Sequence, residues 1–435
     1  MKLKITLVIV FTAFALGVNA QWTTVNLSSS RSGMGAAAAN GKAVFAGGIG
    51  NISIPPAVYD MYNSFTNAWT SGSTSLGRSK VAGASTGNWM MFAGGANDWI
   101  LSEYDRVDKY NALTGQWSNS NSLSVPRAGI SGAGALNKIV FAGGSSGMGQ
   151  MYHNTVDIFD TTTQTWSTAA LTVAREGIAA VANGDKIFFA GGNDASTTYA
   201  TIDVYDVSTN TWTTAALSQA RTGVSAVALG SKVYFAGGLT SSNTVSKIID
   251  IYDMQSGLWA VDSLALARQL ISGGALGSKL IFAGGANANA TSGFTAVDIY
   301  DTLTGLWTTA PCVTNPYGGA SVVVGNKFIV AGGFSSGLAN ASVHIYTLTA
   351  TGLEEENPKL ISVFPNPSSG IFNIEMNQAG KLQVLNATGQ VVLDKDFDAS
   401  ENFIQIDLTQ NTKGLYLIRF TDRKNQESLV KVIVE

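Results

Sequence analysis

The sequence contains very little cysteine and histidine. Its 435 residues include a single cysteine, Cys312, and two histidines, His153 and His344. One cysteine cannot form a disulfide within the chain, so the fold must be held together by its core. Metal sites usually draw on several His or Cys ligands. We therefore expect no metal and no cofactor, and we interpret these three residues as structural.

Charged residues are also scarce, at 13% of the chain, and the formal net charge is −3. Proteins that bind nucleic acids usually carry a basic face or stripe, which this sequence lacks. Beyond residue 20, no apolar run approaches the length that spans a bilayer. Nucleic acid is therefore not an expected partner, and we do not expect an integral membrane protein.

The first 20 residues have the three parts of a secretory signal peptide. Lys2 and Lys4 form a charged start, Ile5–Leu16 an apolar segment, and Val18-Asn19-Ala20 a small-residue cleavage site. A membrane anchor is the alternative, but the apolar segment is short for a span. We expect cleavage before Gln21 and a mature chain outside the cytoplasm.

A four-residue motif, Phe-Ala-Gly-Gly, recurs seven times along most of the chain, and its last copy begins with valine. A period near 50 residues indicates a repeat architecture. A tryptophan and an arginine precede most copies at fixed distances, and a segment like Val297–Asp301 follows each one. The copies begin at Phe45, Phe92, Phe141, Phe189, Phe235, Phe282 and Val330; the tryptophans are Trp22, Trp69, Trp117, Trp166, Trp212, Trp259 and Trp307.

Each repeat reads as four short strands separated by turns. In one repeat the strand-like runs are Ile271–Leu276, Lys279–Ala283, Ala296–Tyr300 and Leu306–Thr309, with Gly277-Ser278 among the turns between them. Four antiparallel strands per unit, repeated around a ring, are typical of a β-propeller. We predict an all-β fold with seven blades, in which the strand around Trp22 completes the last blade and closes the ring.

Over residues 21–350, the ordered set of Arg, Gly-Gly, Tyr-Asp and Trp resembles the kelch repeat. The resemblance implies a kelch-type propeller. Copper-dependent kelch enzymes use a Cys–Tyr cofactor and two histidines, but Cys312, His153 and His344 fall in three different repeat positions here. That catalytic pattern is therefore not expected in this chain.

A second domain is predicted after the ring. Residues 351–358 include Glu354-Glu355-Glu356-Asn357-Pro358 and are interpreted as a linker. Residues 359–435 contain six or seven short alternating runs, which predict a small Ig-like β-sandwich.

This second domain resembles the Por secretion tail, the sorting domain of the type IX secretion system. The resemblance implies passage through the periplasm, export by the type IX machinery as a partner, and a secreted or outer-surface location. The alternative is an accessory sandwich without a sorting role. The motif positions are Pro365, Asn366, Pro367, Gly389, Gly414, Tyr416 and Lys431.

The repeated charges are predicted to pair within each blade. Each arginine begins a first strand and each aspartate begins a third strand on the same rim, with only Gly-Gly between them. The seventh repeat has Pro316 and His344 instead, so both partners are missing together. The alternative is a ring of arginines for an anionic ligand. The pairs are Arg31–Asp60, Arg78–Asp108, Arg127–Asp157, Arg175–Asp203, Arg221–Asp250 and Arg268–Asp298.

Ligand binding is predicted on the loops that follow each Gly-Gly, because they differ most between repeats and variable loops on a rigid scaffold commonly carry recognition. Aromatic side chains beside Asn and Asp suit sugar rings, which offer apolar C–H faces and hydroxyl edges. Packing between neighbouring loops is the alternative. The candidates are Trp99, Tyr104, Tyr152, Tyr199, Phe294, Phe334, Asp98 and Asp194.

Three functional classes remain open, because fold alone does not decide among them. The first is a secreted or surface-displayed binding module for a glycan or protein. The second is an epimerase- or lyase-like carbohydrate-active enzyme, and the third a structural envelope protein. No catalytic residue is assigned. Non-repeated carboxylates that acid/base chemistry would need are Asp98, Glu103, Asp105, Glu176 and Asp194.

Overall fold

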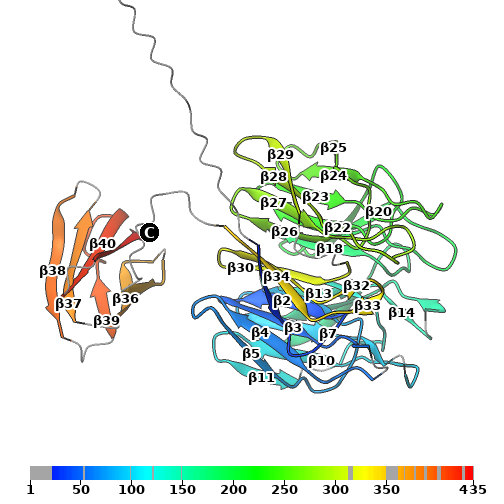
Figure 1. Cartoon of the computed structure of the whole chain (residues 1–435), viewed down its shortest axis with the longest axis horizontal. Coiled ribbons are helices and arrows are strands. Elements are labelled where there is room, and N and C mark those ends of the chain that lie inside the picture. Colours follow the sequence, from blue (N-terminus) through cyan, green and yellow to red (C-terminus); the bar gives the residue numbers. More distant parts are fainter. Residues whose placement is uncertain are drawn as a thin grey trace, which may run out of the picture. The chain divides into compact units, whose positions relative to one another are not determined.

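The computed structural model of the chain forms two compact units that divide between residues 349 and 350 (Figure 1). The predicted signal peptide, the predicted linker, Asp98, Cys312, Pro316 and Pro367 lie outside the described residues. The structure describes residues 22–51, 54–97, 99–119, 122–147, 149–311, 317–348, 361–366, 368–376, 379–386, 389–398, 403–423 and 427–434.

The first unit consists of four-stranded antiparallel sheets, and its described residues contain seven of them. The innermost strands are β2 (Gly35–Ala39), β6 (Ala82–Thr86), β12 (Ser131–Ala135), β18 (Ala179–Asn183), β22 (Ser225–Leu229), β26 (Ser272–Leu276) and β30 (Ala320–Val324). The second strands are β3 (Lys42–Ala46), β7 (Trp89–Ala93), β13 (Lys138–Ala142), β19 (Lys186–Ala190), β23 (Lys232–Ala236), β27 (Lys279–Ala283) and β31 (Lys327–Ala331).

Two further strands complete each sheet on its outer side. The third strands are β4 (Tyr59–Asn63), β10 (Val107–Asn111), β16 (Thr155–Asp160), β20 (Thr201–Asp206), β24 (Ile248–Asp253), β28 (Ala296–Asp301) and β34 (Ser342–Thr347). The outermost strands are β5 (Ala68–Gly72), β11 (Gln116–Asn119), β17 (Thr165–Ala170), β21 (Thr211–Ala216), β25 (Trp259–Ser263), β29 (Leu306–Pro311) and β1 (Trp22–Asn26).

The sheets form a ring in which each innermost strand contacts the next, and β30 contacts β2. The innermost strands come very close, which explains their alanines and glycines. A Cβ atom on Gly134 would lie 2.3 Å from the Ser85 carbonyl oxygen of the neighbouring sheet. The predicted all-β propeller is confirmed.

The N-terminal strand closes the ring. β1 pairs antiparallel with β34, so that Trp22 lies opposite Tyr346, and the last sheet has the order β1-β34-β31-β30. The second strands form the core: Phe45, Phe92 and Phe141 are fully buried. Sheet-to-sheet packing therefore stabilises the ring without covalent links.

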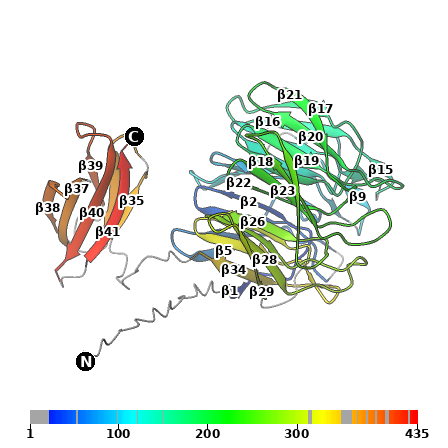
Figure 2. The same ribbon diagram turned by 90° about the horizontal axis from the view of Figure 1, so that it is seen from above.

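The two rims of the ring differ in structure. We call the rim where the second strands end in Gly-Gly the Gly-Gly rim. Figures 1 and 2 show short hairpins on one side of the ring. These hairpins directly follow Gly-Gly; they are β8 (Ala96–Asn97) with β9 (Ser102–Glu103), β14 (Ser145–Ser146) with β15 (Met151–Tyr152), and β32 (Phe334–Ser335) with β33 (Leu338–Ala339).

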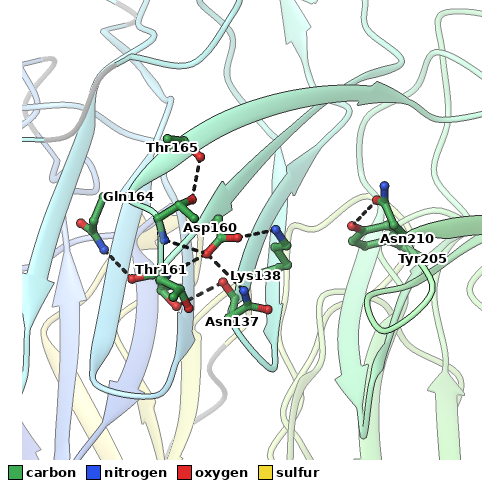
Figure 3. A network of polar contacts seen from close by, with 10 residues as sticks. Asn137, Lys138, Asp160, Thr161, Gln164, Thr165, Tyr205 and Asn210 are labelled. Atoms are coloured by element: carbon green, nitrogen blue, oxygen red, sulfur yellow. Dashed lines mark hydrogen bonds and ion pairs between the residues drawn. The ribbon is translucent and has the colours of Figure 1, made fainter.

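The opposite rim carries tight turns held by side-chain networks (Figure 3). The Asp160 carboxylate accepts hydrogen bonds from Lys138 Nζ at 2.7 Å, from Asn137 Nδ2 at 3.1 Å and from the Thr162 backbone at 2.7 Å. Partial burial raises the pKa of Asp160, but Lys138 and backbone N–H groups outweigh it and bring the pKa to about 2. These hydrogen bonds therefore stabilise the turns of the opposite rim.

The second unit is a sandwich of two antiparallel sheets with a shared core. The core includes Phe372, Leu382, Val384, Ile418 and Phe420, all fully buried. One sheet contains β35 (Ile361–Phe364), β36 (Ile371–Met376) and β39 (Phe403–Asp407); the other contains β37 (Gly380–Asn386), β38 (Val391–Phe397), β40 (Gly414–Asp422) and β41 (Glu427–Val434).

Candidate functional site at the Gly-Gly rim

The structure brings together all six predicted charge pairs. The arginine side chains are at most 1% exposed and their aspartate partners at most 6%. The nearest nitrogen–oxygen distance is 2.8 Å for Arg78–Asp108, Arg127–Asp157 and Arg175–Asp203, and 2.7 Å for Arg268–Asp298; Arg31–Asp60 and Arg221–Asp250 also form ion pairs.

Glycine is required beside these pairs because the chain passes very close to its neighbours there. Gly144 has a φ of 97°, and a Cβ atom would lie 2.6 Å from the Ala128 carbonyl oxygen. Arg127 Nε donates to the Gly143 carbonyl at 2.8 Å, and the backbone N–H of Ser124 donates to Asp157 at 2.9 Å. Each pair thus also ties the loop before the arginine to the sheet.

These buried pairs favour the structural interpretation over an arginine ring for anions. Burial lowers the pKa of the Arg127 guanidinium, while neighbouring Asp157 opposes that change. In the last sheet, His344 takes the place of the aspartate and is 1% exposed. Burial lowers the pKa of His344, so the neutral imidazole is favoured near neutral pH.

Three of the predicted aromatic residues occupy one repeated structural position. The backbone N–H groups of Tyr104, Tyr199 and Phe294 each donate to the carbonyl of the second glycine, at 2.8, 2.9 and 2.9 Å. His153 has the same contact in its own sheet, at 2.9 Å. The carbonyl of Tyr199 accepts from the backbone of Arg221 in the next sheet. These half-buried side chains lie where adjacent sheets meet, which favours a packing role.

Trp99 stands apart from the other candidates because its side chain is 64% exposed. It lies between β8 and β9, next to Ile100 and Leu101, which are both 57% exposed. The Trp99 backbone N–H donates to Asn97 Oδ1 at 3.1 Å, which fixes the turn without using the indole ring. The ring is therefore presented to solvent on the Gly-Gly rim.

The remaining candidates divide between packing and loop structure. Phe334 stacks on the buried Tyr317, with ring centroids 5.6 Å apart. Tyr199 Oη donates to Asp194 Oδ2 at 2.5 Å, and this bond, with others from the backbone, lowers the pKa of Asp194 to about 2. Tyr152 lies in β15, opposite Ser145. Asp194 thus organises its own loop.

A depression of about 450 Å³ opens on the Gly-Gly rim across the second, third and fourth sheets. Its polar lining comes from Lys80, Glu103, Ser145, Glu176 and Asn193. Glu176 Oε2 accepts a hydrogen bond from Ser145 Oγ at 2.6 Å, and Asn193 Oδ1 accepts one from Thr222 Oγ1 at 2.7 Å.

Sequence reasoning singled out Glu103 and Glu176 as non-repeated carboxylates and Asn193 as a polar loop residue, but it missed Lys80 and Ser145. A signal for Lys80 was present in the repeats. Two residues after the arginine, or after Pro316 in the seventh repeat, five repeats have glycine and the sixth has Leu270; the glycines are Gly33, Gly129, Gly177, Gly223 and Gly318. Lys80 adopts the same left-handed conformation, with a φ of 53°, as the glycines do. A lysine in a glycine position marks a local departure from the repeat.

The sorting-motif residues that the structure describes have structural contacts within the sandwich. Asn366 Nδ2 donates to the Lys431 carbonyl at 2.7 Å, and Asn366 Oδ1 accepts from the Ile433 backbone at 3.0 Å. The Asn366 side chain thus hydrogen-bonds to the backbone of β41. Pro365 lies between the end of β35 and Asn366. Tyr416 Oη donates to the Thr412 carbonyl at 2.6 Å. Gly389 and Gly414 have positive φ angles of 83° and 142°.

Among the described residues, no cluster of three or more His, Cys, Asp or Glu side chains is suited to hold a metal ion. Within the same residues, no helix has the length and apolar character needed to cross a bilayer.

Comparisons with known proteins match both parts of the chain. Residues 133–333 match the KLHDC2/KLHL20/DRC7 Kelch-repeats domain, and residues 362–435 match the Secretion system C-terminal sorting domain. A solved structure described as "Structure of YjhT" is similar at 16% identity and a TM-score of 0.52, covering 64% of this chain and 97% of that chain. This likeness supports the fold alone. A search of curated proteins finds no match.

Proposed function

Because the chain combines a kelch-repeat propeller with a C-terminal secretion sorting domain, we propose that it is an exported binding module whose Gly-Gly rim holds a glycan. The sorting domain supports a cell-surface or extracellular location and implies contact with the type IX machinery. Passage through the periplasm, with an N-terminal signal peptide, belongs to the same proposal. A protein ligand is the alternative occupant of the rim.

The observation that carries this proposal is the depression on the Gly-Gly rim. The arginine–aspartate pairs repeat around the ring, whereas the depression is confined to the second, third and fourth sheets. Trp99 lies on the hairpin that follows Gly-Gly in the second sheet, and Glu103 at the end of that hairpin lines the depression. An exposed aromatic ring and polar groups on one rigid face suit the apolar faces and hydroxyl edges of sugars.

Replacing Trp99 by alanine is expected to weaken glycan binding by about 2 kcal/mol or more, as for a hot-spot aromatic. The melting temperature should stay nearly unchanged, because the side chain is 64% exposed. A glycan array, followed by calorimetry with the strongest binder, measures the first quantity, and thermal unfolding measures the second.

Phe65→Ala is the matched control, since Phe65 is 73% exposed in a turn on the opposite rim. It should leave binding unchanged. A Trp99→Ala variant that binds normally but melts at a much lower temperature would show that the indole ring only packs against its neighbours.

A second candidate function is catalysis on carbohydrates. Glu103 and Glu176 line the same depression, and acid/base chemistry on sugars commonly uses a pair of carboxyl groups. An epimerase- or lyase-like activity would convert a bound glycan into a new product. Incubation of the strongest array binder with the exported chain, followed by mass spectrometry and NMR, tests it. Glu176→Gln should abolish any conversion.

A further inference from the structure

The depression carries an excess of negative charge at its surface. Its described lining contains two carboxylates, Glu103 and Glu176, and one ammonium group, Lys80, which give a formal charge of −1. The nearby Arg127 does not change this balance, because it is buried and paired with Asp157 at 2.8 Å. An anionic ligand would therefore meet net repulsion at this site.

Neighbouring titratable groups leave that negative charge uncompensated. His153 Nε2 is 2.8 Å from Ser146 Oγ, and burial first and Arg127 second lower the pKa of His153. The imidazole is therefore favoured in its neutral form at pH 7. Burial raises the pKa of the Tyr152 hydroxyl, and the charges of Glu176 and Asp194 raise it further. Tyr152 thus lies within the field of these carboxylates.

Glycine at position 129 leaves space beside the half-buried Glu176 carboxylate. A Cβ atom on Gly129 would lie only 3.2 Å from Glu176 Oε2. Ser145 and Asn193 provide hydroxyl and amide groups beside the carboxylate. A volume of about 450 Å³ is within the range of small-molecule sites. The depression thus offers anionic and neutral polar partners together.

We propose that this depression binds an amino sugar with a free ammonium group, whose charge pairs with Glu176 and Glu103 and whose hydroxyls contact Ser145 and Asn193. The assignment rests on the proposed glycan-binding function and adds a substrate class to it. It also predicts discrimination against carboxylate-bearing sugars and against N-acetylated sugars, which lack the positive charge. Charge complementarity of this kind governs specificity in polar sites.

Substitution of Lys80 tests whether the depression prefers a positively or a negatively charged ligand. Lys80 lines the same depression as Glu103 and Glu176, so its ammonium would compete with a cationic ligand for these carboxylates. Glycine is the natural replacement, because it occupies this repeat position five times. Lys80→Gly also removes a non-glycine residue from a φ of 53°. We expect this variant to fold and to bind an ammonium ligand more tightly, whereas an anionic ligand would be bound more weakly.

The experiment uses the exported full chain and three probes: a glucosamine tetrasaccharide with free amines, its N-acetylated counterpart, and a uronic acid tetrasaccharide. The wild type should prefer the free amine. Glu176→Gln should weaken that binding by about tenfold or more, Glu103→Gln should act in the same direction, and Lys80→Gly should strengthen it.

Opposite or absent effects overturn the assignment. Preference for the uronic acid, unchanged affinity in Glu176→Gln, or weaker binding by Lys80→Gly would each contradict an ammonium ligand. Binding of an oligolysine peptide with the same dependence on Glu176, without amino-sugar binding, would replace the sugar by a protein ligand. If the wild type binds a neutral glycan unaffected by Glu176→Gln, the glycan-binding proposal stands and only the amino-sugar assignment fails. If it binds no glycan on an array, both fail.

Discussion

Replacing Arg175 by methionine is expected to lower the free energy of unfolding of the propeller by about 3–5 kcal/mol. The Arg175 side chain is fully buried, and its Asp203 partner, 2.8 Å away, is 3% exposed. Removal of the guanidinium leaves a buried carboxylate without its counter-charge. It also leaves the Gly191 carbonyl, which accepts from Arg175 Nε at 2.7 Å, without that donor. Chemical denaturation followed by tryptophan fluorescence measures the loss.

The double variant Arg175→Met with Asp203→Leu is the matched control. Replacing both charges by apolar groups removes the uncompensated carboxylate, so the double variant should regain a large part of the lost stability. The recovery should be incomplete, because the Gly191 carbonyl and the backbone N–H of Thr172 still lack their side-chain partners. A single variant as stable as the wild type would show that the pairs do not stabilise the ring.

Deleting residues 359–435 is expected to stop export while leaving a folded propeller inside the cell envelope. The reason is that the two units are separately compact and that residues 362–435 match a secretion sorting domain. Fractionation of cells that produce the truncated chain, with immunodetection of each fraction, measures its location. We expect it in the periplasm rather than at the surface or in the medium.

A substitution in the propeller serves as the control for a general loss of folding or expression. The full chain with Trp99→Ala should reach the same location as the wild type, because the change lies in the propeller and affects an exposed side chain. Normal appearance of the truncated chain outside the cell would refute a sorting role for the tail.

The propeller could be predicted because its determinants repeat. Each arginine stands at the same distance before a Gly-Gly pair and each aspartate begins the following strand, which placed partners such as Arg78 and Asp108 on the same rim. The closing strand could also be predicted, because Trp22 precedes the first repeat and the last repeat has no tryptophan after Tyr346. The structure pairs this strand with β34. Regular registers of this kind leave little freedom in how strands can pair.

The candidate site was less accessible from the sequence because it depends on contacts between sheets. The loops after Gly-Gly differ in length, which concealed that Tyr104, Tyr199 and Phe294 occupy one shared position. The packing role of Phe334 depends on its contact with Tyr317 across the loop. The depression joins Lys80 and Glu176, which are 96 residues apart in sequence, and no spacing rule relates them.

The most direct test of the account is a hydrogen-exchange map of the exported chain with and without its strongest array glycan. Binding on the Gly-Gly rim predicts slower exchange in residues 99–103, 145–152 and 176–177, which surround the depression and the Trp99 hairpin. The turns of the opposite rim, such as residues 64–67 and 161–164, should be unaffected. Protection confined to those opposite turns, with none around the depression, would contradict ligand binding by the Gly-Gly rim.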